Sequence, residues 1–433
     1  MPWFSEKSER ISPENIEQLL RQTVEEAKKR ICAAPKRVLL LPPDITRAHS
    51  GVGRMTEILY NLLCDEAEVH VIPTLGQHVP HSPEENVRMF GSIPEERIHA
   101  HDWRDGCVRV GEIPADFVEE VSGGAADWAI PIDINRMVIK EQWDLIINVG
   151  HVVPHEVLGF ANHNKNYIIG LGGKDTICTA HMAAACYGIE NNLGTLITPL
   201  RACLNKAEDE FLGDLPDLYV QVVMARSADD ELVHTGIHVG DDLDTYLEAA
   251  RQSREQNITV FDEPLEKVVC VMQGDEFFST WVANKAVYRT RMAMADGGEL
   301  IIIAPGLKRF GEQPDVDELI RKFGYSGTPK IMEAYRTEPM LQDLAHGTAH
   351  LIHGSSEGRF TITYAPSKLS KEEIEGVNFN YADLDEMLAK YPPDKLKEGF
   401  NDLPGGERIF FIPTPSAGLW ATREKLYGRT SAE

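Results

Sequence analysis

The stretch DLIINVG at residues 144–150, followed by PHEVLGFANHNKNYIIGLGGKDTICTAH at residues 154–181, decides how this chain is understood. The first segment is a short apolar run that is typical of a strand buried on both faces. The second places His155, Lys165 and His181 at intervals of ten and sixteen residues after that strand. An imidazole can bind a metal or carry a proton near neutral pH, and a lysine amine becomes a nucleophile or covalent tether when its surroundings lower its pKa. The segment therefore predicts a reaction centre at the end of a strand.

Strands alternate with helices along the rest of the chain. Apolar runs predict strands at residues 37–41, 68–73, 267–272, 299–304, 360–364 and 408–413, and helical periodicity predicts helices at 14–31, 55–63, 277–295 and 382–391. Ser82-Pro83-Glu84-Glu85 has the pattern of a capping box and marks one more helix start. This alternation predicts an α/β fold with largely parallel sheets.

The chain of 433 residues is too long for one compact core, so we expect more than one domain. The strand and helix pattern restarts near Leu265, which puts the boundary within residues 256–266. We therefore expect two α/β domains, residues 1–262 and 263–433, with the last ~20 residues able to pack back on the first domain. The cleft between such domains is a favoured place for a ligand, and we expect the active site there.

Composition excludes several classes of function. The formal charge of −25 argues against nucleic-acid binding through a basic face and against an anionic membrane surface. No apolar run reaches membrane-spanning length, and the N-terminal MPWFSEKSER lacks a hydrophobic signal core. The seven cysteines are scattered without a CxxC pair, which favours reduced thiols in the cytoplasm.

Three more polar segments deserve a functional interpretation, and two of them follow predicted strands. Asp44-Ile-Thr-Arg47 can grip a carboxylate or phosphate through its guanidinium; the alternative is a local cap with a surface ion pair. The segment 74–81 carries His78 and His81, either catalytic or merely polar surface residues. Lys285 lies early in a predicted helix and either meets an anion or is solvated.

Two familiar motifs are absent. His151 and His155 have the i,i+4 spacing of a helical zinc pair, but Pro154 and the preceding strand argue against a zinc-binding helix. The run Gly170-Leu-Gly172-Gly173 lacks both GxGxxG and the P-loop ending. We expect it to be a tight turn before the helix that carries His181.

Taken together, these residues resemble the nickel-dependent lactate racemase family. The resemblance is carried by DxTR at Asp44, by Gly76-x-His78-x-Pro80, and then by Pro154-His155, Gly159-Phe160, Lys165 and His181, in matching order and spacing across the first domain. It continues more loosely around Lys285 and Gly297-Gly298.

The resemblance implies an isomerase that holds a nickel-pincer nucleotide, a pyridinium mononucleotide with sulfur substituents. It assigns roles as follows: Lys165 is the thioamide tether, His181 the nickel ligand, His78 and His155 the acid–base pair, Asp44, Thr46 and Lys285 cofactor-binding residues, and Arg47 and Lys285 substrate-binding residues. It also implies that the hydrogen at C2 of a 2-hydroxy acid leaves as hydride while a histidine takes the hydroxyl proton. Separate biosynthetic and loading enzymes would supply the cofactor.

The chain departs from the family pattern between Phe160 and Lys165. Typical members have Ser-Gly-Gly there, whereas this chain has Ala161-Asn162-His163-Asn164, and Val282 replaces a usual glutamine. From these polar groups we expect Asn162 and His163 to bind a larger, hydroxylated substrate such as an aldonate, for example gluconate. The same residues could instead pack the loop or bind the cofactor.

Three other functions remain open from the sequence. One is racemisation of lactate or another short 2-hydroxy acid. Another is a zinc-dependent hydrolase that uses His78, His155 and His181, with Lys165 as an electrophile. The third is an acidic metal-storage or nickel-carrier protein, which would tolerate Lys165→Ala.

Overall fold

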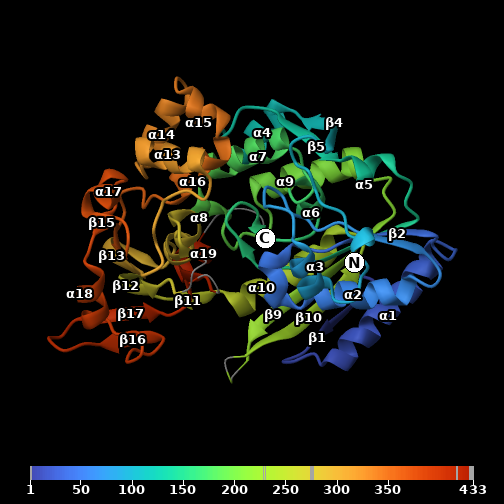
Figure 1. Ribbon diagram of the computed structural model, residues 1–433, viewed down its shortest axis with the longest axis horizontal. Helices are drawn as coiled ribbons and strands as arrows, with labels where there is room; N and C mark the ends of the chain where they lie inside the picture. Colours follow the sequence, from blue (N-terminus) through green and yellow to red (C-terminus); the bar gives the residue numbers. More distant parts are fainter. Residues whose placement is uncertain (1, 228, 230, 274–276, 416–417, 429–433) are drawn as a thin grey trace. The chain divides into compact units, whose positions relative to one another are not determined.

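The computed structural model describes residues 2–227, 229, 231–273, 277–415 and 418–428 (Figure 1). The chain divides into two compact units: unit 1 comprises residues 1–180 and 194–257, and unit 2 comprises residues 181–193 and 258–433. The main division falls near the boundary expected at residue 262. Residues 181–193, and with them His181, group with unit 2.

Unit 1 is built on a six-stranded sheet in the order β1-β10-β9-β6-β2-β3. The four strands from β9 to β3 run parallel, and β10 and β1 add an antiparallel edge. The strands are β1 (Phe4–Lys7), β2 (Arg37–Leu41), β3 (Glu68–Val71), β6 (Leu145–His151), β9 (Asp217–Arg226) and β10 (Leu232–Gly240). Strand β6 lies inside the sheet and is buried along its whole length, which explains its continuous run of apolar residues.

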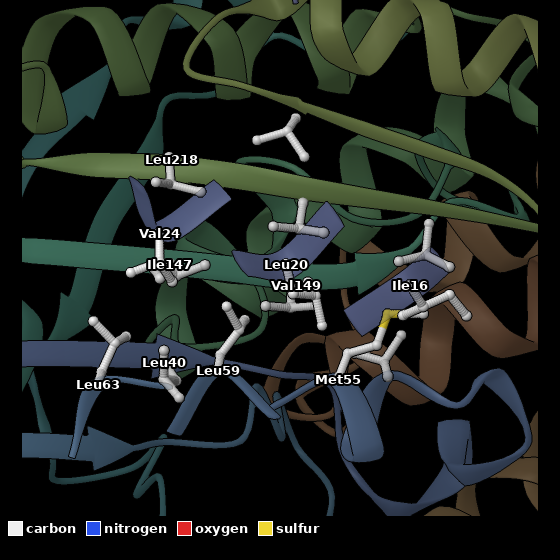
Figure 2. Close-up of a cluster of buried hydrophobic side chains, with 14 of the residues drawn as sticks. Ile16, Leu20, Val24, Leu40, Met55, Leu59, Leu63, Ile147, Val149 and Leu218 are labelled. Atoms are coloured by element: carbon white, nitrogen blue, oxygen red, sulfur yellow. The ribbon is translucent and has the colours of Figure 1, made fainter. Parts of the chain in front are cut away.

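Figure 2 shows the apolar core on one face of this sheet. Helices α1 (Pro13–Arg30) and α2 (Val52–Leu63) place Leu20 and Leu59 against Ile147 and Val149 of β6. The side chains of a strand alternate between faces, so only every second residue of β6 enters this core. Burial of these side chains stabilises the unit by about 1.5–3 kcal/mol for each large residue.

The other residues of β6 and β9 face the opposite side of the sheet. Helix α10 (Leu243–Asn257) covers β9 and β10 there. The segment that precedes Lys165 packs on the same side, because Asn148 of β6 and Gln221 of β9 bond to it. One face of β6 therefore anchors the core, and the other packs against the segment that leads to Lys165.

The remaining elements of unit 1 connect these layers. They are the 3-10 helices η1 (Ile45–Ser50) and η2 (Glu95–Arg97), the π-helix η3 (Glu208–Leu212), the strand pairs β4 (Cys107–Ile113) with β5 (Ile130–Asn135) and β7 (Pro154–His155) with β8 (Gly159–Phe160), and the helices α3 (Pro83–Phe90), α4 (Ala115–Ser122), α5 (Arg136–Lys140), α6 (Lys165–Ile168) and α9 (Pro199–Ala207). Helix α3 begins with the predicted capping box, in which Ser82 and Glu85 bond reciprocally. Helix α7 (Lys174–Tyr187) starts after the glycine turn as expected, and the division between the units falls within it.

Unit 2 has a second six-stranded sheet in the order β15-β14-β13-β12-β17-β16, parallel except for the edge strand β16. Its strands are β12 (Leu265–Val271), β13 (Met294–Ala304), β14 (Thr361–Pro366), β15 (Asn380–Tyr381), β16 (Gly399–Asp402) and β17 (Arg408–Ile412). A separate parallel pair joins β11 (Thr259–Phe261) to β18 (Trp420–Thr422). The described C-terminal residues 418–428 group with unit 2.

The helices of unit 2 are α8 (Ile189–Asn192), α11 (Thr280–Ala283), α12 (Lys285–Thr290), α13 (Pro314–Phe323), α14 (Thr328–Tyr335), α15 (Pro339–Asp343), α16 (Ala345–His353), α17 (Lys371–Gly376), α18 (Leu384–Lys390) and α19 (Arg423–Tyr427). The single helix predicted for residues 277–295 is wrong, because two short helices meet at Asn284 and β13 already begins at Met294. The Asn284 side chain accepts a hydrogen bond from the Tyr364 hydroxyl at 2.7 Å instead of facing solvent. The predicted class, α/β with largely parallel sheets, is confirmed. Within the described ranges no helix is long and apolar enough to cross a membrane.

Candidate functional site

Asp44 and His78 form the first pair of the site, at the carboxyl end of β2. After β2 the chain passes Pro42 and Pro43, and the buried Asp44 then caps the N-terminus of η1 by accepting a hydrogen bond from the Thr46 amide at 3.0 Å. Its other carboxylate oxygen, Oδ2, bonds Nδ1 of His78. Burial by itself raises the pKa of Asp44, but the His78 hydrogen bond and charge, together with Thr46, lower it to about 2.

This pairing sets the tautomer of His78. An ionised carboxylate only accepts hydrogen bonds, so Nδ1 of His78 carries the proton and Nε2 keeps a lone pair in the neutral ring. The His78 side chain is 61% exposed, which leaves Nε2 accessible to a substrate. A carboxylate behind an imidazole in this way is the arrangement of a general base.

His81, the second histidine of the same loop, has a structural role. Its Nε2 accepts a hydrogen bond from the Ile45 amide at 2.8 Å, and its Nδ1 lies 3.1 Å from Oδ1 of Asn86. Because both ring nitrogens are occupied, His81 ties the loop of His78 to the start of η1.

His155 lies in the short hairpin formed by β7 and β8, directly after β6. Its Nδ1 accepts a hydrogen bond from the Val157 amide at 3.2 Å. In this arrangement the proton of the neutral ring is on Nε2, which is then a donor. His78 and His155 are therefore held in opposite tautomers.

Lys165 begins the short helix α6 and is half-buried. Burial, reinforced by the positive charge of Arg47, lowers the pKa of its amine from 10.5 to about 8, and Asp44 opposes the shift. Within the described part of the chain no hydrogen bond to this amine is found. A lysine in this state is a usable nucleophile near neutral pH.

A buried arginine holds the segment that leads to Lys165. Arg201 of α9 is 0% exposed and donates to the backbone oxygens of Phe160 at 2.7 Å and Asn162 at 3.3 Å, and also to the side chain of Asn164. Its guanidinium also stacks over the Tyr246 ring at 4.4 Å. The planar fork of arginine can bridge several acceptors at once, so it fixes the loop as one unit.

Asn162 and His163 lie inside unit 1. They are 2% and 1% exposed, with φ angles of 72° and 60° that place both in the left-handed region. Asn162 donates to Oε1 of Gln221 at 2.6 Å, and Nδ1 of His163 lies 3.2 Å from Nε2 of Gln221. A Cβ on Gly150 would come within 1.9 Å of Asn162 Oδ1, so the close approach of loop and strand requires glycine there. These two side chains are engaged in holding the loop.

The sequence did not single out the residues that complete this network. Asn166 donates to Asn148 at 2.8 Å, and Asn148 in turn donates to the His163 carbonyl at 3.3 Å. Asparagine within an otherwise apolar strand was a usable signal for Asn148, and arginine within PLRACL was one for Arg201.

Two buried polar groups at the same edge of the sheet have no hydrogen-bond partner within the described ranges. They are both ring nitrogens of His151, which ends β6, and the side-chain nitrogen of Gln77, which follows β3. Buried polar groups in native proteins are nearly always satisfied, so such atoms point to a ligand. Ligands of open α/β sheets bind at this carboxyl edge.

The other two predicted site residues belong to unit 2. His181 is half-buried in α7, and Lys285 is the half-buried first residue of α12. The described residues contain no group of three or more His, Cys, Asp or Glu side chains placed to hold a metal ion. Among the described residues, each unit has a cavity of about 400 Å³ that is not lined by any predicted site residue.

Comparison with known proteins agrees with the resemblance seen in the sequence. Residues 5–192 match a family model described as the lactate racemase N-terminal domain, a range that contains every predicted site residue except Lys285. A protein of known crystal structure from Thermotoga maritima is 26% identical, with 96% of this chain and 100% of that chain covered and a TM-score of 0.78. The lactate racemase apoprotein from Thermoanaerobacterium thermosaccharolyticum is 16% identical, with 94% and 92% covered and a TM-score of 0.68, which shows a shared fold. No curated protein sequence matches the chain.

Proposed function

We propose that this protein, whose residues 5–192 match a family model described as the lactate racemase N-terminal domain, is an isomerase that inverts the C2 centre of a 2-hydroxy acid. The observation that carries the proposal is the Asp44–His78 pair together with His155, which is held in the opposite tautomer. Inversion at an alcohol carbon requires one group to take the hydroxyl proton and another to return it. Two imidazoles, one neutral and one protonated, meet that requirement near pH 7.

The residues of unit 1 fit a covalently attached nickel-pincer nucleotide. The Lys165 amine has a lowered pKa and is held on a rigid loop, as a covalent tether requires. In this proposal Lys165 holds the cofactor covalently, Asp44, Thr46 and Lys285 contact it, and His181 binds the nickel. Imidazole suits nickel as a ligand. When bound, the group supplies a reversible acceptor for the hydrogen at C2.

Side chains of the protein bind the substrate and transfer its hydroxyl proton. Arg47 orients the substrate carboxylate through its forked donors. Nε2 of His78 takes the hydroxyl proton, and the Asp44 carboxylate stabilises the imidazolium that results. His155, when protonated, returns a proton from Nε2 to the oxygen of the inverted product and is left as a neutral imidazole.

For the substrate we propose a polyhydroxylated sugar acid, an aldonate such as gluconate. The polar residues Asn162 and His163, which first suggested it, are engaged in holding the loop, so they serve as positioning residues. Support now comes from the unpartnered His151 and Gln77 at the same edge of the sheet. Lactate or another short 2-hydroxy acid is the alternative substrate, and a zinc-dependent hydrolase is the alternative enzyme.

The test uses protein produced together with the enzymes that make and load the cofactor. Gluconate, malate and lactate are each incubated with it, and the products are resolved by epimer-resolving or chiral chromatography. We expect epimerisation of gluconate and loss of activity in Lys165→Arg and His78→Asn. Turnover of lactate alone would contradict the sugar-acid substrate, and turnover of none of the three would contradict the racemase proposal.

Mass spectrometry and metal analysis separate the alternatives in the same preparation. The proposal predicts added mass on Lys165 and one nickel per chain. Stoichiometric zinc with an unmodified Lys165 would instead favour the hydrolase.

A further inference from the structure

His151 is the last residue of β6 and is only 7% exposed. It pairs across the sheet with Val222 of β9, whose side chain belongs to the apolar core of Figure 2. Alternation along the strand places His151 on the same face as Ile147 and Val149. The His151 imidazole therefore follows the apolar side chains of Ile147 and Val149 on this face and lies at the carboxyl edge of the sheet.

Neither ring nitrogen of His151 has a hydrogen-bond partner within the described residues. A buried imidazole normally has both nitrogens satisfied, as His101 shows in the same unit. Nε2 of His101 bonds the Gly172 carbonyl at 3.1 Å, and its Nδ1 bonds Asn135 at 2.9 Å. Two unsatisfied nitrogens in one buried ring destabilise the protein, so something must compensate.

The surroundings of His151 keep its ring neutral. Burial first, and then the charges of Arg47, His49 and His234, lower its pKa well below the usual value. The His49 ring lies edge-on with a centroid distance of 6.1 Å. A neutral imidazole presents one donor and one acceptor at opposite corners of the ring.

His49 belongs to η1, the short helix that also carries Arg47, so His151 lies beside one segment of the proposed site. A carboxylate can satisfy the donor of a neutral imidazole but not its acceptor. A hydroxyl group can satisfy either corner, because it both donates and accepts. A chain of neighbouring hydroxyl groups is therefore the ligand whose chemistry suits this ring.

We propose that His151 contacts the hydroxyl groups of the substrate beyond C2 and selects polyhydroxylated 2-hydroxy acids over short aliphatic ones. This inference rests on the proposed function and names the residue that sets its substrate class. Arg47 binds the carboxylate of the acid, and His151 forms hydrogen bonds with the hydroxyl groups beyond C2.

The kinetic test compares gluconate with lactate in cofactor-loaded protein. His151→Phe keeps a flat ring without polar atoms, and we expect it to raise KM for gluconate about tenfold or more with a smaller change in kcat. Relative to that variant, His151→Asn restores a donor and an acceptor and recovers part of the affinity. KM for any lactate turnover changes by less than about twofold in both, because lactate has no hydroxyl beyond C2. The control is His101→Asn, which we expect to lower thermal stability without changing the preference between the two acids.

A spectroscopic readout separates binding from folding. In protein labelled with ¹⁵N-histidine, the His151 ring signals are identified by their loss in His151→Asn. We expect gluconate to shift them and lactate to leave them in place. Unmoved signals with gluconate, or an unchanged KM in His151→Phe, would overturn the inference while leaving the epimerase proposal intact. Absence of turnover with every 2-hydroxy acid would instead defeat the proposed function itself.

Discussion

The buried carboxylate of Asp44 bonds Nδ1 of His78 while its other oxygen accepts the amide of Thr46 at 3.0 Å. This one contact connects two segments that follow different strands, β2 and β3. It also determines which nitrogen of His78 is available for chemistry, because the proton is held on the side of Asp44. In the proposed function, the role of His78 as a base therefore depends on the carboxylate of Asp44.

Asp44→Asn tests this dependence. The amide no longer fixes the His78 tautomer or stabilises an imidazolium, so we expect kcat to fall by about 10²- to 10⁴-fold. Steady-state kinetics of the loaded protein give the measurement. Since the pKa of Asp44 is about 2, the acidic limb of the pH profile in the unaltered protein belongs to another group. The control, Asp65→Asn, changes an exposed carboxylate outside the proposed site, and it should leave kcat unchanged. A kcat near that of the unaltered protein in Asp44→Asn would contradict the assignment.

The reactivity of Lys165 provides a second prediction that needs no cofactor. Competitive labelling of the apoprotein with an amine reagent across pH should give a midpoint near 8 for Lys165. Exposed lysines should label with midpoints near 10.4. Arg47→Ala removes the positive charge that helps to lower this pKa, so the midpoint should rise, whereas Arg47→Lys should keep it low. A midpoint that does not respond to Arg47→Ala would show that the arginine charge does not act on Lys165.

Arg201 gives a third prediction, about stability. Arg201→Met leaves the Phe160 and Asn162 carbonyls and the Asn164 side chain without their donor, so we expect a loss of about 2–4 kcal/mol in the free energy of unfolding. Arg201→Lys should restore little, because an ammonium does not reproduce the fork. Denaturant unfolding measures both.

The matched control for Arg201 is Arg109→Met on the surface. Arg109 pairs with Asp133 and is about half exposed, so its loss should cost less than about 1 kcal/mol. Similar losses in the two methionine variants would contradict the structural role of Arg201. The Arg201 variant should also carry less cofactor mass on Lys165, because the loop that presents the amine is loosened.

The α/β class and most element positions could be predicted because they rest on local signals. Helix α3 and its capping box follow from Ser82 and Glu85, and β6 follows from an uninterrupted apolar run. The prediction of a single helix at residues 277–295 is wrong because of a tertiary contact. Asn284 interrupts it while bonded to Tyr364, a contact separated by eighty positions that no local pattern records.

The candidate site could be predicted only in part, for a similar reason. The sequence shows which histidines and lysines follow predicted strands. Whether such a residue contacts a ligand or only holds the loop depends on its burial, which the sequence does not give. The sequence leaves open whether Asn162 and His163 bind the substrate, bind the cofactor or pack the loop; both lie in the interior, bonded to Gln221 from β9. The sequence argues against a zinc site at His151 and indicates no other role for it. Only its unsatisfied ring nitrogens, among the described residues, distinguish it from an ordinary core histidine.

A half-buried pair of acidic residues, Glu208 and Asp217, next to the Lys165 loop gives the last prediction. Burial, and then the negative charge of Glu208, raise the pKa of Asp217 from 3.8 to about 7. Glu208 is itself bonded to the hydroxyl of Tyr219 and to Asn164 at 2.9 Å, so the pair supports the loop. Between about pH 4 and pH 7 the folded protein keeps a proton on Asp217 that the unfolded chain has released.

Because the folded state then binds more protons than the unfolded state, this group lowers stability as the pH rises through that window, and the loss persists above it. Asp217→Asn removes the ionisation while keeping the shape of the side chain. We expect the variant to gain a few degrees in Tm at pH 8 relative to the unaltered protein and little at pH 4.5. Asp214→Asn, at an exposed position in the same segment, should show no such difference between the two pH values. An equal change in Tm at both pH values in Asp217→Asn would mean that the carboxyl is ionised in the folded protein, and that Glu208 and Asp217 do not compete for charge.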